Sequence, residues 1–210
     1  MARTPDLDRI TDRASWRAFK DADLKAYGVS NWRPHYRLMY PGLYYQRVMR
    51  HVEFLYATGR RRSAQLRHAY LKVLGIVSGI SVPPGVFGRG LTIPHVGSIV
   101  INDKVRAGSF CRIHSATNIG EHKGAAPVLG DGVYVGPGAV LYGAIHLGSR
   151  CVVGANSVVN SDVSDNLVVA GAPARVVSAA VPNDSMPTHI LRELDKFDAS
   201  KGNREASADA

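Results

Sequence analysis

The middle of the chain, from Phe87 to Val177, repeats hydrophobic and small residues with a fixed six-residue period. A second series of small or apolar residues keeps the same period from Val133 to Val163. Glycine follows four of the six aliphatic residues in the most regular run, which is Leu129, Val135, Leu141, Leu147, Val153 and Val159. A period of this kind predicts a β-helix, in which each coil stacks on the next and buries a continuous core.

Each coil of such a β-helix is expected to hold three hexapeptides, or about eighteen residues, with strands roughly 4.8 Å apart. The roughly ninety residues of the repeat therefore predict about five coils. We expect the aliphatic residues to point into the core. The glycines that follow them are expected to supply backbone angles that other residues resist at a corner.

The repeat loses its phase twice, and each interruption carries a histidine. The aliphatic spacing is eight residues across 93–101, where His95 lies, and ten across 119–129, where His122 lies in a loop. Departures from a rigid scaffold are where binding and catalytic residues often lie. A third histidine, His114, comes nineteen residues after His95. We expect these two to lie at neighbouring places on adjacent coils, because the two-residue insertion brings Ile93 and Ile113 into stacking positions.

The sequence outside the repeat predicts mainly helix. We expect a helical N-terminal region over residues 1–75 and the β-helix over 76–178. The C-terminal segment, 179–210, is expected to hold a short helix from Thr188 and to be disordered from Ala199 onward. The predicted fold class is therefore mainly β, with a short helical region before the β-helix.

The charge and composition of the chain exclude few kinds of binding partner. The 210 residues carry a formal charge of +9, which suits an anionic partner such as a phosphorylated cofactor or a membrane surface. The sequence has no recognised nucleic-acid motif, so we expect no nucleic-acid partner. It also has no apolar signal core at its start, so we expect a cytoplasmic protein. Cys111 and Cys151 occupy small-residue positions of the repeat and are expected to be buried thiols.

Three features together resemble the hexapeptide acyltransferases, in the serine acetyltransferase branch with its relatives in polysaccharide biosynthesis. They are the hexapeptide run, the segment Gly90-Leu91-Thr92-Ile93-Pro94-His95, and the ending Gly171-Ala172-Pro173-Ala174-Arg175. The resemblance covers about residues 75–178. It implies a left-handed parallel β-helix, a homotrimer with active sites between subunits, and acetyl-CoA as the acyl donor.

The same resemblance implies roles for the histidines. His95 matches the catalytic histidine of serine acetyltransferases, a general base that takes the proton of the acceptor hydroxyl during direct acetyl transfer. Histidine suits this step because its ordinary pKa leaves it largely neutral near pH 7. His114 is a second catalytic candidate at the same pocket, and His122 is a candidate for substrate binding.

CoA contacts are expected from backbone amides and small residues along one face of the prism, with an arginine as a partner for phosphate. The candidates are Gly120, Ala139, Ser157, Ala174 and Arg175.

The pattern Arg112-Ile113-His114, followed by Gly124-Ala125-Ala126-Pro127-Val128-Leu129-Gly130, resembles the polysaccharide-associated relatives more than the serine acetyltransferases. That resemblance implies a hydroxyl of a sugar or sugar-like molecule as the acceptor. Serine acetyltransferases carry aspartates where Pro94 and Ile80 stand here, and a histidine where Ala126 precedes Pro127. These differences remove an orienting carboxylate and part of a serine site. Two alternatives stay open: serine O-acetylation in cysteine biosynthesis, and a non-catalytic trimeric scaffold.

A metal-dependent carbonic anhydrase could use the same prism, but its zinc needs three converging histidines. The spacings of nineteen and eight residues between His95, His114 and His122 do not match such a site. We therefore expect no metal.

Overall fold

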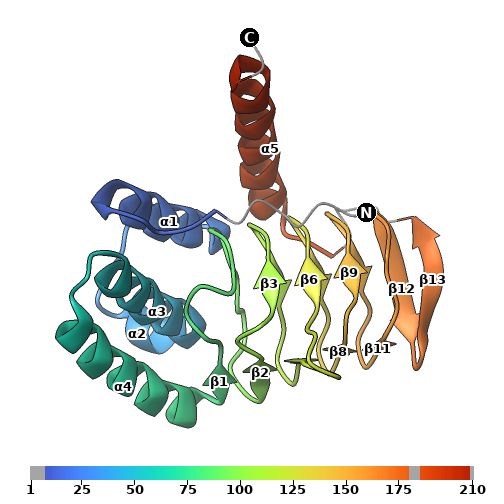
Figure 1. Cartoon of the computed structure of the whole chain (residues 1–210), viewed down its shortest axis with the longest axis horizontal. Helices are drawn as coiled ribbons and strands as arrows, with labels where there is room; N and C mark the ends of the chain where they lie inside the picture. Colours follow the sequence, from blue (N-terminus) through green and yellow to red (C-terminus); the bar gives the residue numbers. More distant parts are fainter. Residues whose placement is uncertain (1–7, 180–184, 209–210) are drawn as a thin grey trace.

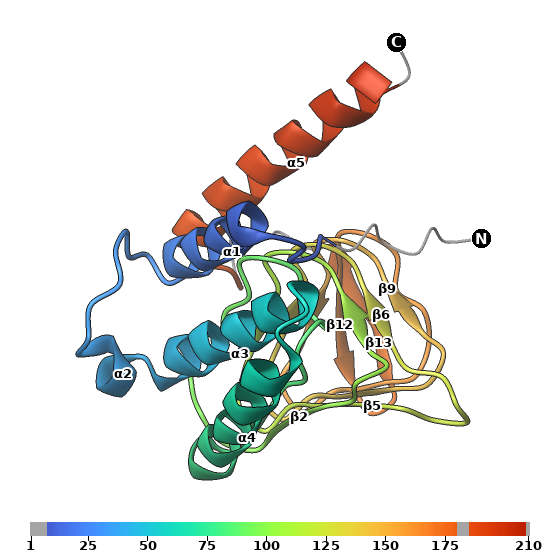
Figure 2. The ribbon, with the colours of Figure 1, turned by 60° about the vertical axis from the view of Figure 1, so that its left-hand side comes forward.

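The computed structural model describes residues 8–179 and 185–208 of the chain. Helices lie against one end of a prism of short strands, and a further helix stands out from its side (Figure 1). Figure 2 shows the N-terminal helices stacked on that end. They are α1 (Arg13–Ala26), α2 (Tyr36–Met39), α3 (Pro41–Ala57) and α4 (Arg61–Ser78). The helical region therefore ends at Ser78, three residues beyond the predicted boundary at 75.

Three parallel sheets form the faces of the prism, and the β-helix predicted from the repeat is confirmed. The first sheet contains β1 (Ile80–Ser81), β2 (Ile99–Ile101), β5 (Asn118–Gly120), β8 (Val140–Tyr142) and β11 (Val158–Val159). The second contains β3 (Arg106–Ala107), β6 (Val128–Leu129) and β9 (His146–Leu147). The third contains β4 (Arg112–Ile113), β7 (Tyr134–Val135), β10 (Val152–Val153), β12 (Leu167–Gly171) and the antiparallel β13 (Ala174–Ala179). The five strands of the first sheet mark five successive coils.

The aliphatic positions of the repeat point into the prism and stack from coil to coil. Ile119 pairs with Leu141, and Val135 pairs with Val153, and all four side chains are buried. Both cysteines are free thiols in the same core, as expected. Burial of stacked aliphatic side chains is therefore the main source of stability for the prism.

The glycines that follow the aliphatic residues have a different role from the predicted one. None of Gly108, Gly130 and Gly148 has a left-handed backbone. Instead, a Cβ added at Gly130 would lie 2.6 Å from the backbone nitrogen of Ser149 on the next coil. These glycines are needed because successive coils approach too closely for a side chain, and corner angles do not explain them.

Replacing Gly130 with alanine is expected to lower the free energy of unfolding by about 1–3 kcal/mol, because the neighbouring backbone would have to shift. Gly120→Ala is the matched control at the same repeat position, where a new Cβ would meet only the Asn118 side-chain oxygen, at 3.3 Å. The control should stay within about 0.5 kcal/mol of wild type. Denaturant unfolding at one fixed protein concentration measures both, and equal losses would contradict the interpretation.

The helices are joined to the first coil by a fully buried arginine. Arg50 on α3 donates from Nε to Asp23 of α1 at 3.0 Å, and it pairs with Glu53 at 3.2 Å. Its guanidinium also donates to the carbonyl oxygens of Phe87 at 2.9 Å and Gly88 at 2.6 Å. One side chain thus holds two helices and the start of the β-helix together.

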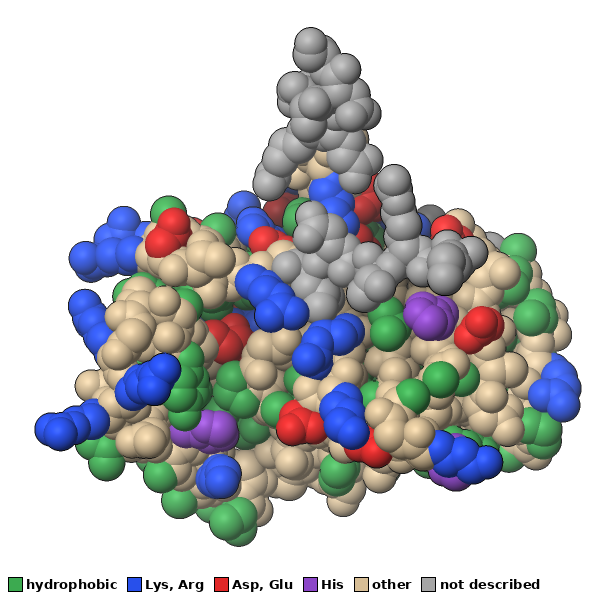
Figure 3. All heavy atoms as spheres, in the orientation of Figure 1, with side chains coloured by type: hydrophobic (Ala, Val, Ile, Leu, Met, Phe, Trp, Pro, Cys, Tyr) green, Lys and Arg blue, Asp and Glu red, His purple; other side chains and the backbone are tan. Residues whose placement is uncertain are grey.

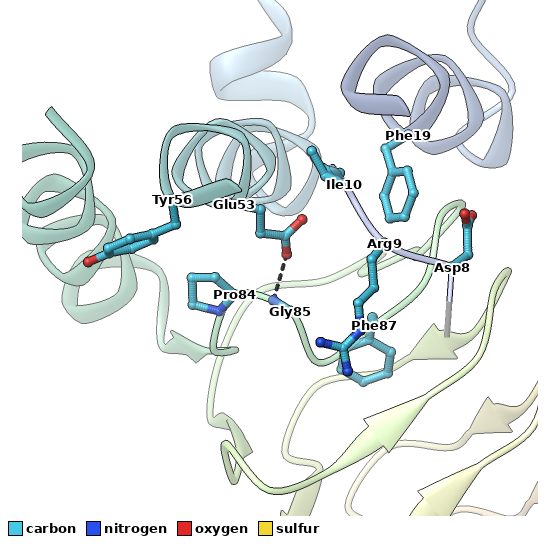
Figure 4. Close-up of a pocket in the computed structure, with 9 residues that line it drawn as sticks. All are labelled: Asp8, Arg9, Ile10, Phe19, Glu53, Tyr56, Pro84, Gly85 and Phe87. Carbon is cyan, nitrogen blue, oxygen red and sulfur yellow. Dashed lines mark hydrogen bonds between the residues drawn. The ribbon is translucent and has the colours of Figure 1, made fainter. Parts of the chain in front are cut away.

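The two carboxylates of this network bind the same coil directly. Asp23 accepts the Gly90 N–H at 2.8 Å, and Glu53 accepts the Gly85 N–H at 2.8 Å. Figure 4 shows Glu53 and Gly85 at the edge of a cavity of about 220 Å³, with Phe19 and Ile10 on the helical side. The carboxylates of Asp23 and Glu53, which belong to the helices, therefore fix the loop of residues 85–90.

Arg50→Met is expected to destabilise the protein by about 3–5 kcal/mol, because two buried carboxylates would lose their cation. Arg60→Met removes an exposed arginine from the turn between α3 and α4 and should cost no more than about 1 kcal/mol. Thermal or denaturant unfolding of the two variants provides the test. A loss for R50M no larger than that for R60M would show that the network does not hold the junction.

The C-terminal helix is longer than predicted. α5 runs from Thr188 to Ala208, through the part that was expected to be disordered from Ala199 onward. The ring of Phe197 lies 5.6 Å from that of Phe110, and Lys201 pairs with Asp131 at 3.0 Å. These contacts with the prism hold the second half of the helix in place, which its local sequence did not reveal.

Candidate active site

The two histidines that were predicted to be neighbours lie together at the corner between the third and first sheets. The N–H of Ile113 donates to the Thr92 carbonyl oxygen at 2.9 Å, so the first two coils stack in the expected register. This register places the ring centroids of His95 and His114 6.0 Å apart. The pair occupies the first two coils, directly beside the helical region.

His114 is half-buried between His95 and Tyr134, whose ring centroid lies 5.1 Å away. Burial lowers the pKa of His114 to about 4, and the positive charges of Arg112 and His95 act in the same direction. Its Nε2 atom is buried and has no hydrogen-bond partner among the described residues. His114 is therefore neutral near pH 7 and retains an unused hydrogen-bonding atom beside His95.

His95 is exposed, but the backbone that leads to it is held rigidly by the helices. The Tyr27 hydroxyl lies 2.7 Å from the Ile93 carbonyl oxygen and accepts the Ile93 N–H at 3.0 Å. A Cβ at Gly42 of α3 would lie 2.2 Å from the same carbonyl oxygen. Helices α1 and α3 therefore position the segment that carries His95, while its side chain stays open to a ligand.

His122 lies at a different corner of the prism, in the loop between β5 and β6. Its ring packs edge-on against Tyr142, with the centroids 5.7 Å apart. The fold of one chain thus separates His122 from the pair, whereas His95 and His114 are brought together.

The candidate CoA residues lie in varied environments. The side chains of Ala139 and Ser157 are buried inside the prism, and the Ser157 hydroxyl accepts the Gly171 N–H at 3.2 Å. Gly120 is half-buried at the end of β5, and Ala174 is buried at the start of β13. Arg175 is exposed, so it is the member of this set whose side chain points outward. A CoA molecule lying along the outside of the prism would contact the other four candidates mainly through their backbone atoms.

Two residues beside the histidine pair were given no role at the site by the sequence analysis. Tyr27 was assigned only to a helix, although its hydroxyl holds the His95 segment. Arg112 is half-buried beside His114 and forms no ion pair among the described residues. The available signal for Arg112 was its place in the repeat, because the residue before an inward aliphatic residue lies on the outer face.

Within the part of the chain that the structure describes, no three histidine, cysteine, aspartate or glutamate side chains lie close enough to hold a metal ion. In the same residues, no helix combines the length and the apolar composition needed to cross a bilayer.

Comparison with known proteins gives a consistent set of similarities. Residues 126–161 match the family model described as bacterial transferase hexapeptide (six repeats). The chain is 33% identical to a serine acetyltransferase of Helicobacter pylori J99 over 146 residues, which cover 67% of this chain and 84% of the relative. It is 41% identical over 92 residues to WcaB of Escherichia coli K12, assigned as a colanic acid biosynthesis acetyltransferase, with 42% and 57% covered.

Solved structures show the same fold. The serine acetyltransferase of Neisseria gonorrhoeae in complex with serine superimposes with a TM-score of 0.66 at 29% identity, covering 79% of this chain and 70% of that one. A serine acetyltransferase in complex with CoA gives a TM-score of 0.65 at 25% identity, covering 79% and 71%.

The low pKa of His114 predicts a pH-dependent contribution to stability. An unfolded histidine titrates near pH 6.5 and the folded one near 4, so between these values the unfolded state binds more protons. The free energy of unfolding should therefore fall as the pH drops from about 6.5 to about 4. His114→Gln is expected to reduce this fall, whereas His122→Gln serves as an exposed control. Denaturant unfolding across this pH range tests it, and parallel curves for wild type and H114Q would contradict it.

Proposed function

Because the chain belongs to the serine acetyltransferase family of hexapeptide transferases, as its resemblance implied, we propose that this CoA-dependent O-acetyltransferase acetylates the hydroxyl of L-serine. The observation that carries the proposal is the pair His95 and His114 on the first two coils, next to helices that fix its backbone. The comparisons favour this acceptor over the sugar hydroxyl expected from the sequence. The Helicobacter match covers 67% of this chain and 84% of the relative, whereas the WcaB match covers 42% of this chain and 57% of the relative.

His95 acts as the general base in this proposal. It takes the proton of the acceptor hydroxyl as that oxygen attacks the carbonyl carbon of the acetyl thioester. The carbon–sulfur bond then breaks, and the imidazolium of His95 returns the proton to the departing sulfur of CoA. No covalent bond to the enzyme is needed, so positioning supplies much of the rate enhancement.

His114 is proposed to orient the acceptor. Its Nε2 is buried and has no partner among the described residues, so a small rotation of the ring on binding would let it form a hydrogen bond with the acceptor without losing another. The guanidinium of Arg112, which forms no ion pair within the described part of the chain, lies beside it and suits the carboxylate of an amino acid, since arginine recognises carboxylates through paired donors. Both features support a small acceptor with a carboxylate.

A sugar hydroxyl is the second candidate acceptor. Pro94, Ile80 and Ala126 stand where the resemblance implies two aspartates and a histidine of a serine site. The 41% identity to a protein of polysaccharide biosynthesis points the same way. The reaction steps at His95 would be unchanged, because only the group that carries the hydroxyl differs.

We further propose that the working unit is a homotrimer with its active sites between subunits. His122 lies at another corner of the prism from His95, so a neighbouring chain is needed to bring a loop histidine to the pair. The same arrangement would place CoA along an outer face, near Gly120 and the backbone at Ala139 and Ser157. Arg175, with Ala174 before it, would meet a phosphate.

Release of free thiol from acetyl-CoA tests the activity. We expect turnover with L-serine, and we expect His95→Asn to lower kcat by about 10²–10⁴-fold because the general base is lost. His146→Asn is the matched control on β9, outside the proposed site, and should retain activity. Parallel reactions contain simple sugars and nucleotide sugars.

The outcomes separate the candidates. Turnover with a sugar but not with serine would replace the proposed acceptor by the second one. Turnover that survives H95N would remove His95 from its role as base. No thiol release with any acceptor, together with no binding of CoA, would leave the non-catalytic scaffold.

A further inference from the structure

Helix α4 has two apolar faces, and the fold uses only one of them. Ala64 and Leu71 are buried against the rest of the helical region, and Gly75 approaches the Ile80 carbonyl of β1. The opposite face carries a stripe of exposed apolar residues, here called the outer stripe. Its members and their exposed fractions are Leu66 77%, Tyr70 38%, Val73 54%, Ile76 83% and Val77 81%.

The spacing of the outer stripe makes it continuous. Residues three, four or seven positions apart lie on one side of a helix, so the stripe runs along most of α4. A second exposed apolar patch, Leu38 and Met39, lies on α2 in the same helical region, with exposed fractions of 89% and 61%. Contiguous exposed apolar surface of this kind usually marks a binding surface.

The excess positive charge of the chain lies entirely in the helical region. Residues 1–78 contain 15 lysines and arginines against six acidic residues, whereas residues 79–210 contain 11 of each. On α4 itself, Arg61, Arg62 and Lys72 are exposed and flank the outer stripe. Figure 3 shows lysine and arginine side chains over the helices at the left, with hydrophobic side chains below them.

We propose that α4 lies on the surface of an anionic lipid bilayer, with the outer stripe among the acyl chains and the flanking cations at the headgroups. A helix with a continuous apolar face and basic flanks binds membranes in this way, through buried apolar area and attraction to acidic lipids. None of the described helices can span a bilayer, so the contact is peripheral. The proposal does not depend on which acceptor the enzyme uses.

Charge favours a bilayer over a second copy of the chain as the occupant of this face. Two copies would bring together helical regions that both carry the whole positive excess, and like charges facing each other oppose association. An anionic bilayer complements both the apolar outer stripe and the cations that flank it. The helical end would therefore face the membrane, with the prism extending away from it.

Sedimentation with lipid vesicles tests the proposal on the full chain. The probes are vesicles of phosphatidylglycerol and phosphatidylcholine in equal parts, and vesicles of phosphatidylcholine alone. The variant Leu66→Gln with Val77→Gln shortens the apolar stripe at two highly exposed positions. Its matched control is Val176→Gln with Val177→Gln, two exposed valines of β13 with exposed fractions of 58% and 59%.

We expect wild type and the β13 control to bind the anionic vesicles, and L66Q/V77Q to bind about tenfold more weakly or less. Arg61→Gln with Arg62→Gln should weaken binding severalfold, as should salt at about 0.5 M. No binding by wild type, or equal binding by L66Q/V77Q, would overturn the proposal. So would a smaller assembly for L66Q/V77Q in sedimentation velocity, because a second copy would then cover the stripe. Thiol release with a soluble acceptor should be the same in L66Q/V77Q and wild type, which keeps this test separate from that of the acetyltransferase activity.

Discussion

A buried positive charge must be surrounded by hydrogen-bond acceptors, and Arg50 meets this requirement only where the helices join the β-helix. Its guanidinium is paired with Asp23 and Glu53 and also reaches two carbonyl oxygens of the first coil. These acceptors come from α1, α3 and the first coil, so the guanidinium finds them where the three elements meet. The contact therefore specifies the position of the helical region, which a purely apolar interface would leave less defined.

The candidate site depends on this junction, since its histidines lie on the first two coils. The carboxylates that pair with Arg50 bind the backbone at Gly85 and Gly90, just before the segment that carries His95. Tyr27 continues the same support at Ile93. The exposed side chain of His95 thus stands on a backbone fixed from the helical side, which is what pre-organised catalysis would require of the proposed base.

The repeat was predictable because each coil places its inward residue at a fixed period, whatever the rest of the chain does. The proximity of His95 and His114 could be predicted too. Once the two-residue insertion is allowed for, the repeat places the two histidines at neighbouring positions on adjacent coils. The roles of Arg50 and Tyr27 could not be predicted, because their partners on the β-helix lie more than thirty residues away in the sequence. The glycines were predicted correctly as a pattern but for the wrong reason, since only the structure shows how closely the coils approach.

Helix α5 touches elements that a simple stack of coils would keep apart. Its first turns pack against α1, where His189 lies 3.1 Å from the Ala26 carbonyl oxygen. Further along, Asp195 and Asp198 pair with Arg150, and Lys201 pairs with Asp131, on two successive coils. In a linear repeat protein each unit contacts only its neighbours, so the ends can fray independently. Because α5 links the helical region to later coils, unfolding of one of these coils would remove contacts that hold the others. The solenoid is therefore expected to unfold cooperatively, as a globular domain does.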